Sequence, residues 1–271
     1  MSPSCRRVVA DRMTFGLWES RRPPGADSPS VVLVHGIGMS HRYLSRLHAV
    51  LADLTHVVSV DLPGFAGLPK PSDDPDVRRM GRALSEVIAS LGEERIIVVG
   101  HSMGAQWAAE AVLHRPERVQ AVVAIGPVVD QRHRSLMAQA RALAVDTLGE
   151  TPLINLIVFA DYLRCGVPWY LKQARHMIAH PTEQRYAELQ PPVLVIRGGD
   201  DPVAGRAWCR RLRDAARAAR LVEVPGRNHV VQHSAPRAVA AAIMANTVGP
   251  WPPSARSAAR RTTGGSTSSA C

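Results

Sequence analysis

Lysine is almost absent from this sequence: it occurs only at Lys70 and Lys172, and arginine carries nearly all of the positive charge. The formal net charge at pH 7 is +10, and such a charge can serve nucleic-acid binding. The arginines, however, are scattered along the chain, and no basic tract interleaved with aromatic residues occurs, as a nucleic-acid surface tends to show. We therefore expect no nucleic-acid partner and a solvated basic surface.

Long apolar runs and paired cysteines are also missing. No run approaches the roughly 18 apolar residues of a membrane span, and the basic N-terminus lacks the apolar segment of a signal peptide. None of the 4 cysteines stands in a CxxC or Cys/His spacing, so neither a metal site nor a disulfide framework is indicated. We expect a cytoplasmic protein without membrane span, metal or cofactor, and the oligomeric state stays open.

Short β-branched runs alternate with longer segments of helical spacing along most of the 271 residues. The expected strands are Val31–Val34, His56–Val60, Ile96–Val99, Val119–Ile125, Val193–Ile196 and Leu221–Val224. The expected helices between them are Tyr43–Leu54, Val77–Leu91, Ala105–His114 and Ala204–Ala219. Fully apolar strands that alternate with helices predict an α/β fold, with a mostly parallel sheet covered on both faces. The segment Arg7–Trp18 is expected to add an antiparallel pair at the sheet edge.

The alternation is interrupted once, which predicts the domain organisation. We expect core segments at residues 1–130 and 191–248, a helical cap at 131–190 and a disordered tail at 249–271, which is rich in Pro, Ser, Gly and Arg. The expected cap helices are Ser135–Leu148, Pro152–Leu163 and Trp169–His180. The apolar second segment either lines an acyl pocket or packs on the core.

A serine between two glycines follows one of the expected strands, where the chain reads IVVGHSMGA from Ile97 to Ala105. Strand, G-x-S-x-G and helix form the context of a nucleophile elbow, in which a sharp turn projects the serine hydroxyl above the sheet edge. Gly100 and Gly104 relieve the crowding in such a turn. The motif alone also fits an ordinary strand-to-helix turn with Ser102 as the helix N-cap.

A serine nucleophile needs a histidine base and an acid that orients the base. After the fifth expected strand the chain reads RGGDDP, which contains Asp200 and Asp201, and after the sixth it reads PGRNH, which ends at His229. The order serine, acid, histidine is therefore met, with each group in a loop just beyond an expected strand.

With these residues in place, the chain resembles the α/β-hydrolase superfamily over roughly residues 5 to 248. Five motifs carry the resemblance: His35-Gly36-Ile37-Gly38, Asp61-Leu62-Pro63-Gly64-Phe65, Gly100-His101-Ser102-Met103-Gly104, Gly198-Gly199-Asp200-Asp201-Pro202, and Gly226-Arg227-Asn228-His229 followed by Pro236. In detail, MGAQWA followed by RPERVQAVVAIGPVVD is most similar to capped, ester-hydrolase-like bacterial members. The resemblance implies an α/β-hydrolase fold with a helical cap inserted between core strands.

The resemblance also implies a role for each of three residues. Ser102 attacks the substrate carbonyl, His229 takes its proton and delivers it to the leaving group, and Asp201 orients the imidazole. Asp201 is preferred to Asp200 because it directly precedes a proline, which is the family's usual position. Asp130 stays a third candidate, because some members take their acid from an earlier strand.

The oxyanion formed in this chemistry needs backbone donors in a dry site. The resemblance implies the N–H groups of Ile37 and Met103, with Gly38 as the alternative to Ile37 if the loop register differs by one residue. Trp107, one turn into the helix after Ser102, either borders the substrate pocket or packs the helix on the sheet.

The other histidines are expected to be structural. His101 follows the strand alternation and points away from Ser102, and His35 is expected to bond within its glycine turn. His233 stays a second candidate for the base. The cap histidines are expected on the surface, and they are His133, His176 and His180.

The chain departs from the family pattern in one loop. Many relatives have Gly-Phe-Gly-x-Ser after the second long strand, whereas this chain has Gly64-Phe65-Ala66-Gly67-Leu68, which leaves the local loop shape open. Serine at the nucleophile position, in place of aspartate, argues against the epoxide-hydrolase and haloalkane-dehalogenase branches.

These observations favour a serine hydrolase that cleaves a carboxylic ester of a small or medium apolar substrate through an acyl-enzyme. A carbon–carbon bond hydrolase, thioesterase, lactonase or cofactor-free haloperoxidase uses the same triad and fold, so fold and triad do not choose among them. A non-catalytic ligand-binding protein of the same fold is the alternative from a different class.

Overall fold

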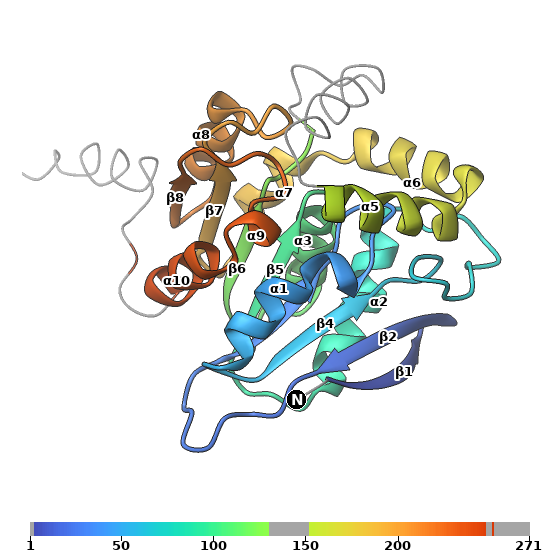
Figure 1. The fold of residues 1–271 in the computed structure, drawn as a ribbon, viewed down its shortest axis with the longest axis horizontal. Helices are drawn as coiled ribbons and strands as arrows, with labels where there is room; N and C mark the ends of the chain where they lie inside the picture. The colour runs from blue at the N-terminus through green and yellow to red at the C-terminus, as the bar shows by residue number, and fades with distance from the viewer. Residues whose placement is uncertain (1–2, 130–151, 248–250, 252–271) are drawn as a thin grey trace, which may run out of the picture.

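The computed structural model describes residues 3–129, 152–247 and 251 (Figure 1). The strands are β1 (Ser4–Ala10), β2 (Met13–Glu19), β3 (Ser30–Val34), β4 (Val57–Asp61), β5 (Ile96–His101), β6 (Val119–Ile125), β7 (Val193–Gly198) and β8 (Ala219–Val224). The helices are α1 (His41–Ala52), α2 (Val77–Ser90), α3 (Gly104–His114), α5 (Pro152–Cys165), α6 (Val167–Ala179), α7 (Thr182–Glu188), α8 (Arg206–Ala215), α9 (Val231–Ser234) and α10 (Pro236–Thr247).

The strands form one sheet in the order β1-β2-β4-β3-β5-β6-β7-β8. From β4 to β8 all neighbours are parallel, whereas β1 and β2 are antiparallel to each other and β2 is antiparallel to β4. Helices α1, α9 and α10 pack on one face, and α2, α3 and α8 pack on the other. The expected α/β fold class and the antiparallel pair at the sheet edge are both confirmed.

The edge hairpin turns through two residues, Asp11 and Arg12, whose φ angles are 45° and 60°. Positive φ at both central residues gives the turn a twist that matches the flanking strands, which join at the Ala10–Met13 pair. The Arg79 Nε donates to the Asp11 Oδ2 at 2.7 Å. This ion pair connects the hairpin to α2.

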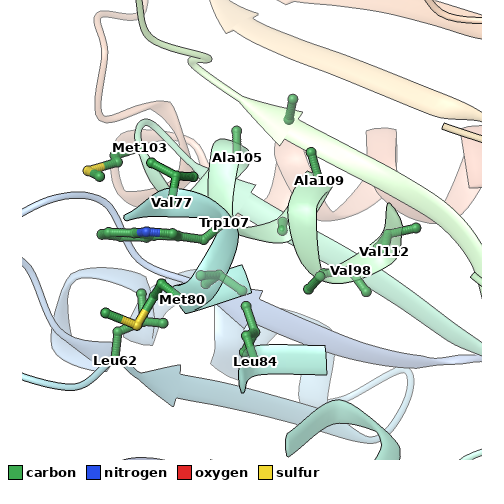
Figure 2. Packing of buried hydrophobic residues seen from close by; sticks show 14 of the residues in the cluster. Leu62, Val77, Met80, Leu84, Val98, Met103, Ala105, Trp107, Ala109 and Val112 are labelled. Carbon is green, nitrogen blue, oxygen red and sulfur yellow. The ribbon is translucent and has the colours of Figure 1, made fainter. Parts of the chain in front are cut away.

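The sheet is buried on both faces because its central strands carry apolar side chains on both sides. Figure 2 shows part of the larger cluster, in which Trp107 of α3 lies near Val77 and Met80 of α2. These two helices pack closely because α2 has a glycine at the contact: a Cβ at Gly81 would lie 2.3 Å from the Cβ of Glu110. The position of α3 matters for function, because it begins directly after Ser102.

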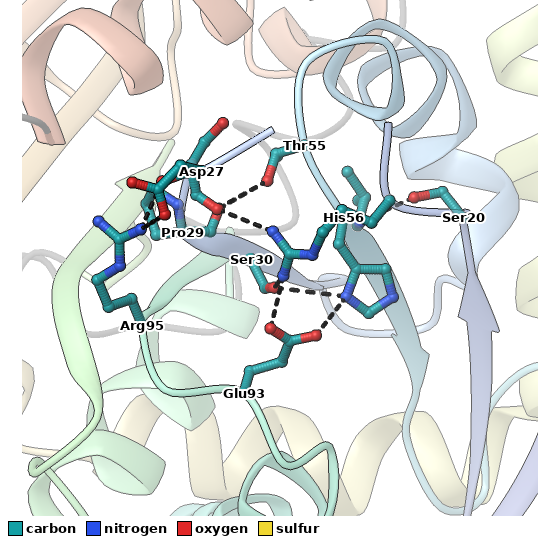
Figure 3. A network of polar contacts seen from close by, with 11 residues as sticks. Ser20, Asp27, Pro29, Ser30, Thr55, His56, Glu93 and Arg95 are labelled. Atoms are coloured by element: carbon teal, nitrogen blue, oxygen red, sulfur yellow. Dashed lines mark hydrogen bonds and ion pairs between the residues drawn. The ribbon is translucent and has the colours of Figure 1, made fainter. Parts of the chain in front are cut away.

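A polar network closes the sheet at the amino ends of β3, β4 and β5 (Figure 3). The Arg22 Nη2 donates to the Glu93 Oε2 at 2.6 Å and to the Ser30 Oγ at 2.7 Å. The other oxygen of Glu93 lies 3.0 Å from the Nδ1 of His56. The network lies at the edge of the sheet opposite to the carboxyl strand ends.

Helices α5, α6 and α7 come between β6 and β7 in the chain and lie over the carboxyl ends of the strands (Figure 1). The Ser40 Oγ donates to the Asp161 Oδ2 at 2.6 Å, and the Tyr186 hydroxyl donates to the Ala105 carbonyl at 2.9 Å. The expected helix Ser135–Leu148 and, apart from residue 251, the expected tail at 249–271 lie outside the described residues.

Candidate active site

The turn after β5 holds Ser102 in a strained backbone conformation, with a φ of 57°. The Ser102 N–H donates to the Ile125 carbonyl at the end of β6, at 2.9 Å. A Cβ at Gly100 would lie 2.3 Å from the Gly104 carbonyl oxygen, and a Cβ at Gly104 would lie 2.5 Å from the His35 carbonyl oxygen. Both flanking positions therefore require glycine, because the added atom would meet backbone that cannot move aside.

His229 and Asp201 face each other across the loops after β8 and β7. The Nδ1 of His229 lies 3.0 Å from the Oδ2 of Asp201. The other oxygen of Asp201 accepts hydrogen bonds from the N–H groups of Val203 and Ala204, at 2.7 and 2.8 Å. The neighbouring Asp200 is exposed, so of these two carboxylates it is Asp201 that meets the histidine. The third candidate, Asp130, lies outside the described residues.

The small residue after β6, Gly126, leaves room for this pair. A Cβ at Gly126 would lie 3.0 Å from the imidazole of His229 and 3.4 Å from the Oδ2 of Asp201. Gly126 directly follows Ile125, whose carbonyl holds the Ser102 N–H. Ser102, Asp201 and His229 are 7%, 4% and 2% exposed, so each of the three groups is largely shielded from water.

Two backbone donors lie beside Ser102. A Cβ at Gly36 would lie 3.0 Å from the Cβ of Ser102, which places the turn that contains Ile37 directly against the serine. Within the described part of the chain, neither the Ile37 N–H nor the Met103 N–H has a hydrogen-bond acceptor. Met103 is the N-cap of α3, where the helix dipole favours negative charge.

The charge states of the buried groups follow from their partners. Burial by itself raises the pKa of Asp201, but the charge and hydrogen bond of His229 and the two backbone N–H groups outweigh it and hold the pKa below the usual range. Burial lowers the pKa of His101 to about 3, and His101 contacts the His229 carbonyl through its Nε2 at 3.1 Å. His101 is therefore neutral at pH 7 and supports the histidine loop.

Arg197, in β7, supports the loop that carries Asp201. Its Nε donates to the Ala204 carbonyl at 2.9 Å and its Nη2 donates to the Asp201 carbonyl at 3.3 Å. Its remaining Nη1 pairs with Glu223 of β8. Nothing in the sequence marks Arg197, because a hydrogen bond from an arginine to a backbone oxygen leaves no motif.

Helices α5 and α6 cover two glycine turns, the first of which contains Ile37. A Cβ at Gly38 would lie 2.4 Å from the ring of Tyr162, and a Cβ at Gly64 would lie 2.5 Å from the ring of Trp169. The rings of Tyr162 and Tyr170 are 5.2 Å apart, edge to face. These cap aromatics therefore form the roof over the turn that contains Ile37.

Three side chains considered as candidates from the sequence, those of Trp107, His35 and His233, are buried. Trp107 is completely buried, and the centroid of its ring lies 5.7 Å from that of Phe65. Of the two alternatives for Trp107, this placement fits packing of the helix. His35 bonds the Gly36 carbonyl at 2.7 Å, and it also accepts from the Leu62 N–H at 3.1 Å. His233, the second candidate for the base, lies in the short helix α9 and is 3% exposed.

One expectation about the cap histidines is wrong. His180 is 4% exposed and lies 2.8 Å from Glu110 of α3, because the chain between α6 and α7 packs against that helix. Arg185 of α7 bonds the same carboxylate at 2.7 Å. His176, at 24% exposure, pairs with Asp74, and His133 lies outside the described residues.

Metal-dependent and cysteine-based reactions have less support in the described residues. No group of three or more His, Cys, Asp or Glu side chains in them could hold a metal ion. Burial raises the pKa of Cys165 to about 11 and that of Cys209 to about 12, so both thiols stay protonated. Over the same residues, no helix has both the length and the apolar character needed to cross a membrane.

Comparison with known proteins identifies the fold. A family model described as "Alpha/beta hydrolase family" matches residues 31–242. The structure is similar to that of a bacterial membrane phospholipase A described as a virulence factor, with a TM-score of 0.76 and 21% identity over 90% of this chain and 85% of that one. It is also similar to the enol-lactonase from Burkholderia xenovorans LB400, with a TM-score of 0.74 and 17% identity over 89% of this chain and 98% of that one. At such identities the likeness shows the fold alone.

Relatives with a closer sequence match cover less of the chain. Proteins provisionally named carbamate hydrolase RutD, among them that of Escherichia coli O1:K1 / APEC, are 35% identical over 104 residues. The match includes 38% of this chain and 39% of the relative. The chain therefore aligns with about two fifths of the length of these relatives.

Proposed function

This chain belongs to the alpha/beta hydrolase family, and we propose that it is a serine hydrolase acting on carboxylic esters of small or medium apolar substrates. The observation that carries the proposal is the surroundings of Ser102. Its strained turn lies beside the N–H groups of Ile37 and Met103, which have no acceptor within the described chain. The His229–Asp201 pair lies against Gly126, the residue after the carbonyl that accepts from the Ser102 N–H.

The reaction has two halves. His229 takes the proton of the Ser102 hydroxyl while the serine oxygen attacks the ester carbonyl, and the N–H groups of Ile37 and Met103 stabilise the resulting oxyanion. The carbon–oxygen bond to the alcohol then breaks, and His229 gives its proton to the leaving oxygen. A water molecule repeats the attack on the acyl-enzyme, and it releases the acid and the free serine.

Asp201 stabilises the imidazolium that forms in both halves. Its depressed pKa keeps it ionised at neutral pH, and the N–H groups of Val203 and Ala204 fix the oxygen that does not face His229. The carboxylate is thereby held in one orientation before the substrate binds.

We take α5, α6 and α7 as the cap that selects the substrate. The side chains that the cap presents to the glycine turns, Tyr162 and Trp169, are aromatic, and such surfaces suit an apolar acyl or alcohol group. Carbamates and lactones present a similar carbonyl to the serine, so they belong in the same substrate panel.

The test is a panel of nitrophenyl esters of increasing acyl length, together with a thioester, a lactone and a carbamate. We expect turnover of the esters, and we expect Ser102→Ala and His229→Ala each to lower kcat by at least ~10³-fold, with a double variant no worse than either single one. A substrate panel without turnover in the wild-type protein would contradict an enzymatic role.

The acid position has a matched control in the adjacent residue. We expect Asp201→Asn to lower kcat about as strongly as the histidine variant, since the imidazole loses its orienting charge. The neighbouring variant Asp200→Asn removes an exposed carboxylate and should leave kcat within about twofold of the wild type. Equal losses in both variants would contradict the assignment of Asp201.

A further inference from the structure

The outer side of α5 and α6 carries an unusual group of exposed apolar side chains. Of the 7 large apolar side chains that are exposed in the described chain, 5 lie between residues 156 and 171. These are Leu156 at 64%, Phe159 at 61%, Leu163 at 68%, Val167 at 70% and Leu171 at 45% exposure. We call these five residues the outer cap face.

The spacing of the outer cap face shows that it is a surface of these helices. Leu156, Phe159 and Leu163 follow one another at intervals of three and four residues, so they share one side of α5. Val167 and Leu171 are four residues apart on α6 and continue the apolar surface beyond the helix break. The opposite sides of the helices carry Cys165 and Trp169, which are buried.

The exposed charges of α5 and α6 themselves have one sign. The exposed charged side chains of α5 and α6 are Arg164, Lys172 and Arg175. The carboxylate of α5, Asp161, is 2% exposed and bonds Ser40 and Arg164. Among the described residues, no carboxylate pairs with Lys172 or Arg175.

One acidic side chain from outside these helices reaches α6. The Oδ1 of Asp74, in the loop before α2, lies 3.0 Å from the Nε2 of His176. His176 is only partly exposed. The exposed rim of the outer cap face is therefore basic, in a chain whose formal net charge is +10.

We propose that the outer cap face lies on the surface of an anionic lipid layer. Apolar side chains that line one side of a helix and are bordered by cations are the feature by which peripheral helices bind in the plane of a membrane interface. The apolar groups enter the boundary between head groups and acyl chains, and Lys172 and Arg175 meet the lipid phosphates.

The charges favour lipid over a second copy of this chain. In a twofold contact through the same face, the cations of one copy would meet the cations of the other, without a carboxylate from either helix to neutralise them. A lipid layer supplies the missing negative charge. The contact is peripheral, since neither helix is long enough to cross a membrane.

The outer cap face lies on the helix that covers the turn beside Ser102, so lipid binding there would affect the surroundings of the candidate active site. Tyr162 lies on the same helix as Leu163, and its ring covers Gly38 in the turn beside Ser102. Docking on this face therefore brings the cap roof next to the lipid. The proposal does not depend on the ester chemistry, because binding can be measured without turnover.

The test uses the full chain and sedimentation with vesicles of phosphatidylcholine alone or mixed with phosphatidylglycerol. We expect binding to the mixed vesicles that weakens as salt rises. The pair Leu163→Ser/Val167→Ser should weaken binding by about tenfold or more, as should the charge-reversing pair Lys172→Glu/Arg175→Glu. Ser102→Ala should bind as the wild type does, which separates binding from hydrolysis.

Two matched pairs control for general effects of polarity and charge. Val9→Ser/Leu54→Ser removes exposed apolar side chains of β1 and of the loop after α1, and Arg210→Glu/Arg237→Glu reverses two exposed charges on α8 and α10. Both pairs should keep wild-type binding.

Three results would overturn the proposal. They are failure of the wild type to bind mixed vesicles, equal binding to vesicles without the anionic lipid, and an equal loss in a control pair. A dimer that dissociates in Leu163→Ser/Val167→Ser, without vesicle binding by the wild type, would identify the outer cap face as a contact between copies and would equally overturn it.

Discussion

Arg197 and Asp201 are joined through the backbone of one loop. The Nη2 of Arg197 donates to the Asp201 carbonyl at 3.3 Å, while its Nε donates to the Ala204 carbonyl at 2.9 Å. The side chain of Arg197 is 5% exposed, so the guanidinium is an internal support for the loop. The orientation of the carboxylate toward His229 therefore depends on an arginine four residues earlier in the chain.

We expect Arg197→Lys to lower kcat by about tenfold while KM stays within about twofold, because a single ammonium nitrogen replaces the two guanidinium nitrogens that reach the two carbonyls. A variant whose only defect is a less stable fold would have a lower melting temperature, but its kcat would not fall while KM stays constant. The control is Arg206→Lys, since Arg206 pairs with the same Glu223 but does not bond the loop. An equal kcat loss in both variants would count against the positioning role.

Ala66 gives a prediction about stability. It stands at a φ of 55°, in the left-handed region, and the following Gly67 stands at 79°. A residue with a Cβ is strained there, so Ala66→Gly should raise the free energy of unfolding by about 0.5–1 kcal/mol. Gly67→Ala, which meets nothing within 4 Å, should lower it by about 1 kcal/mol through strain alone. Urea denaturation measures both, and a shift of the same sign in the two variants would contradict this explanation.

Glu110 makes the stability of the protein depend on pH. Burial raises its pKa, but the hydrogen bonds from His180 and Arg185 outweigh burial and lower the pKa to about 2, from an ordinary value of 4.5. The unfolded chain therefore binds the proton more readily than the folded one, so this stabilisation is complete above pH 4.5 and is lost as the pH falls toward 2.

We expect Glu110→Gln to lower the free energy of unfolding at pH 7 by on the order of 2 kcal/mol and to flatten its fall below pH 4.5. Urea denaturation at several pH values measures this. The control is Glu86→Gln, on the exposed side of α2, which should keep the wild-type profile. A wild-type slope retained in Glu110→Gln would show that another group causes the acid dependence.

The network at the amino ends of the strands should affect stability without affecting catalysis. Arg22→Ala removes the bonds to Glu93 and Ser30 (Figure 3), so we expect a loss of about 1–2 kcal/mol in unfolding free energy with kcat unchanged. Arg21→Ala, at the exposed neighbouring position, should change the stability by less than about 0.5 kcal/mol. A fall in kcat in Arg22→Ala would contradict the separation of the network from the site.

The strands and the members of the site could be predicted for a common reason. Apolar runs such as Val119–Ile125 stand out from the helical spacing around them, and that strand has the expected bounds. Parallel strands end at one edge, so residues that follow them, such as Asp201 and His229, meet although 28 residues apart. The choice of Asp201 over Asp200 as the partner of His229 needed the resemblance, because the residues alone left both carboxylates open.

Other features could not be predicted because they depend on tertiary contacts. A histidine in a predicted surface cap carries no sign that it is buried, and His180 is buried because a carboxylate and an arginine from two other helices surround it. The motif at Gly64-Phe65-Ala66 departs from the family pattern, yet Ala66 adopts the left-handed conformation despite its Cβ. The bonds of Arg197 go to backbone oxygens, which any sequence supplies.

Labelling with a fluorophosphonate, followed by mass spectrometry of the modified peptide, tests Ser102 as the nucleophile. We expect one label per chain, on Ser102 in its strained turn at a φ of 57°, and loss of labelling in Ser102→Ala and His229→Ala. A label on another serine, or labelling that persists in Ser102→Ala, would contradict the assignment of the nucleophile and with it the proposed hydrolytic mechanism.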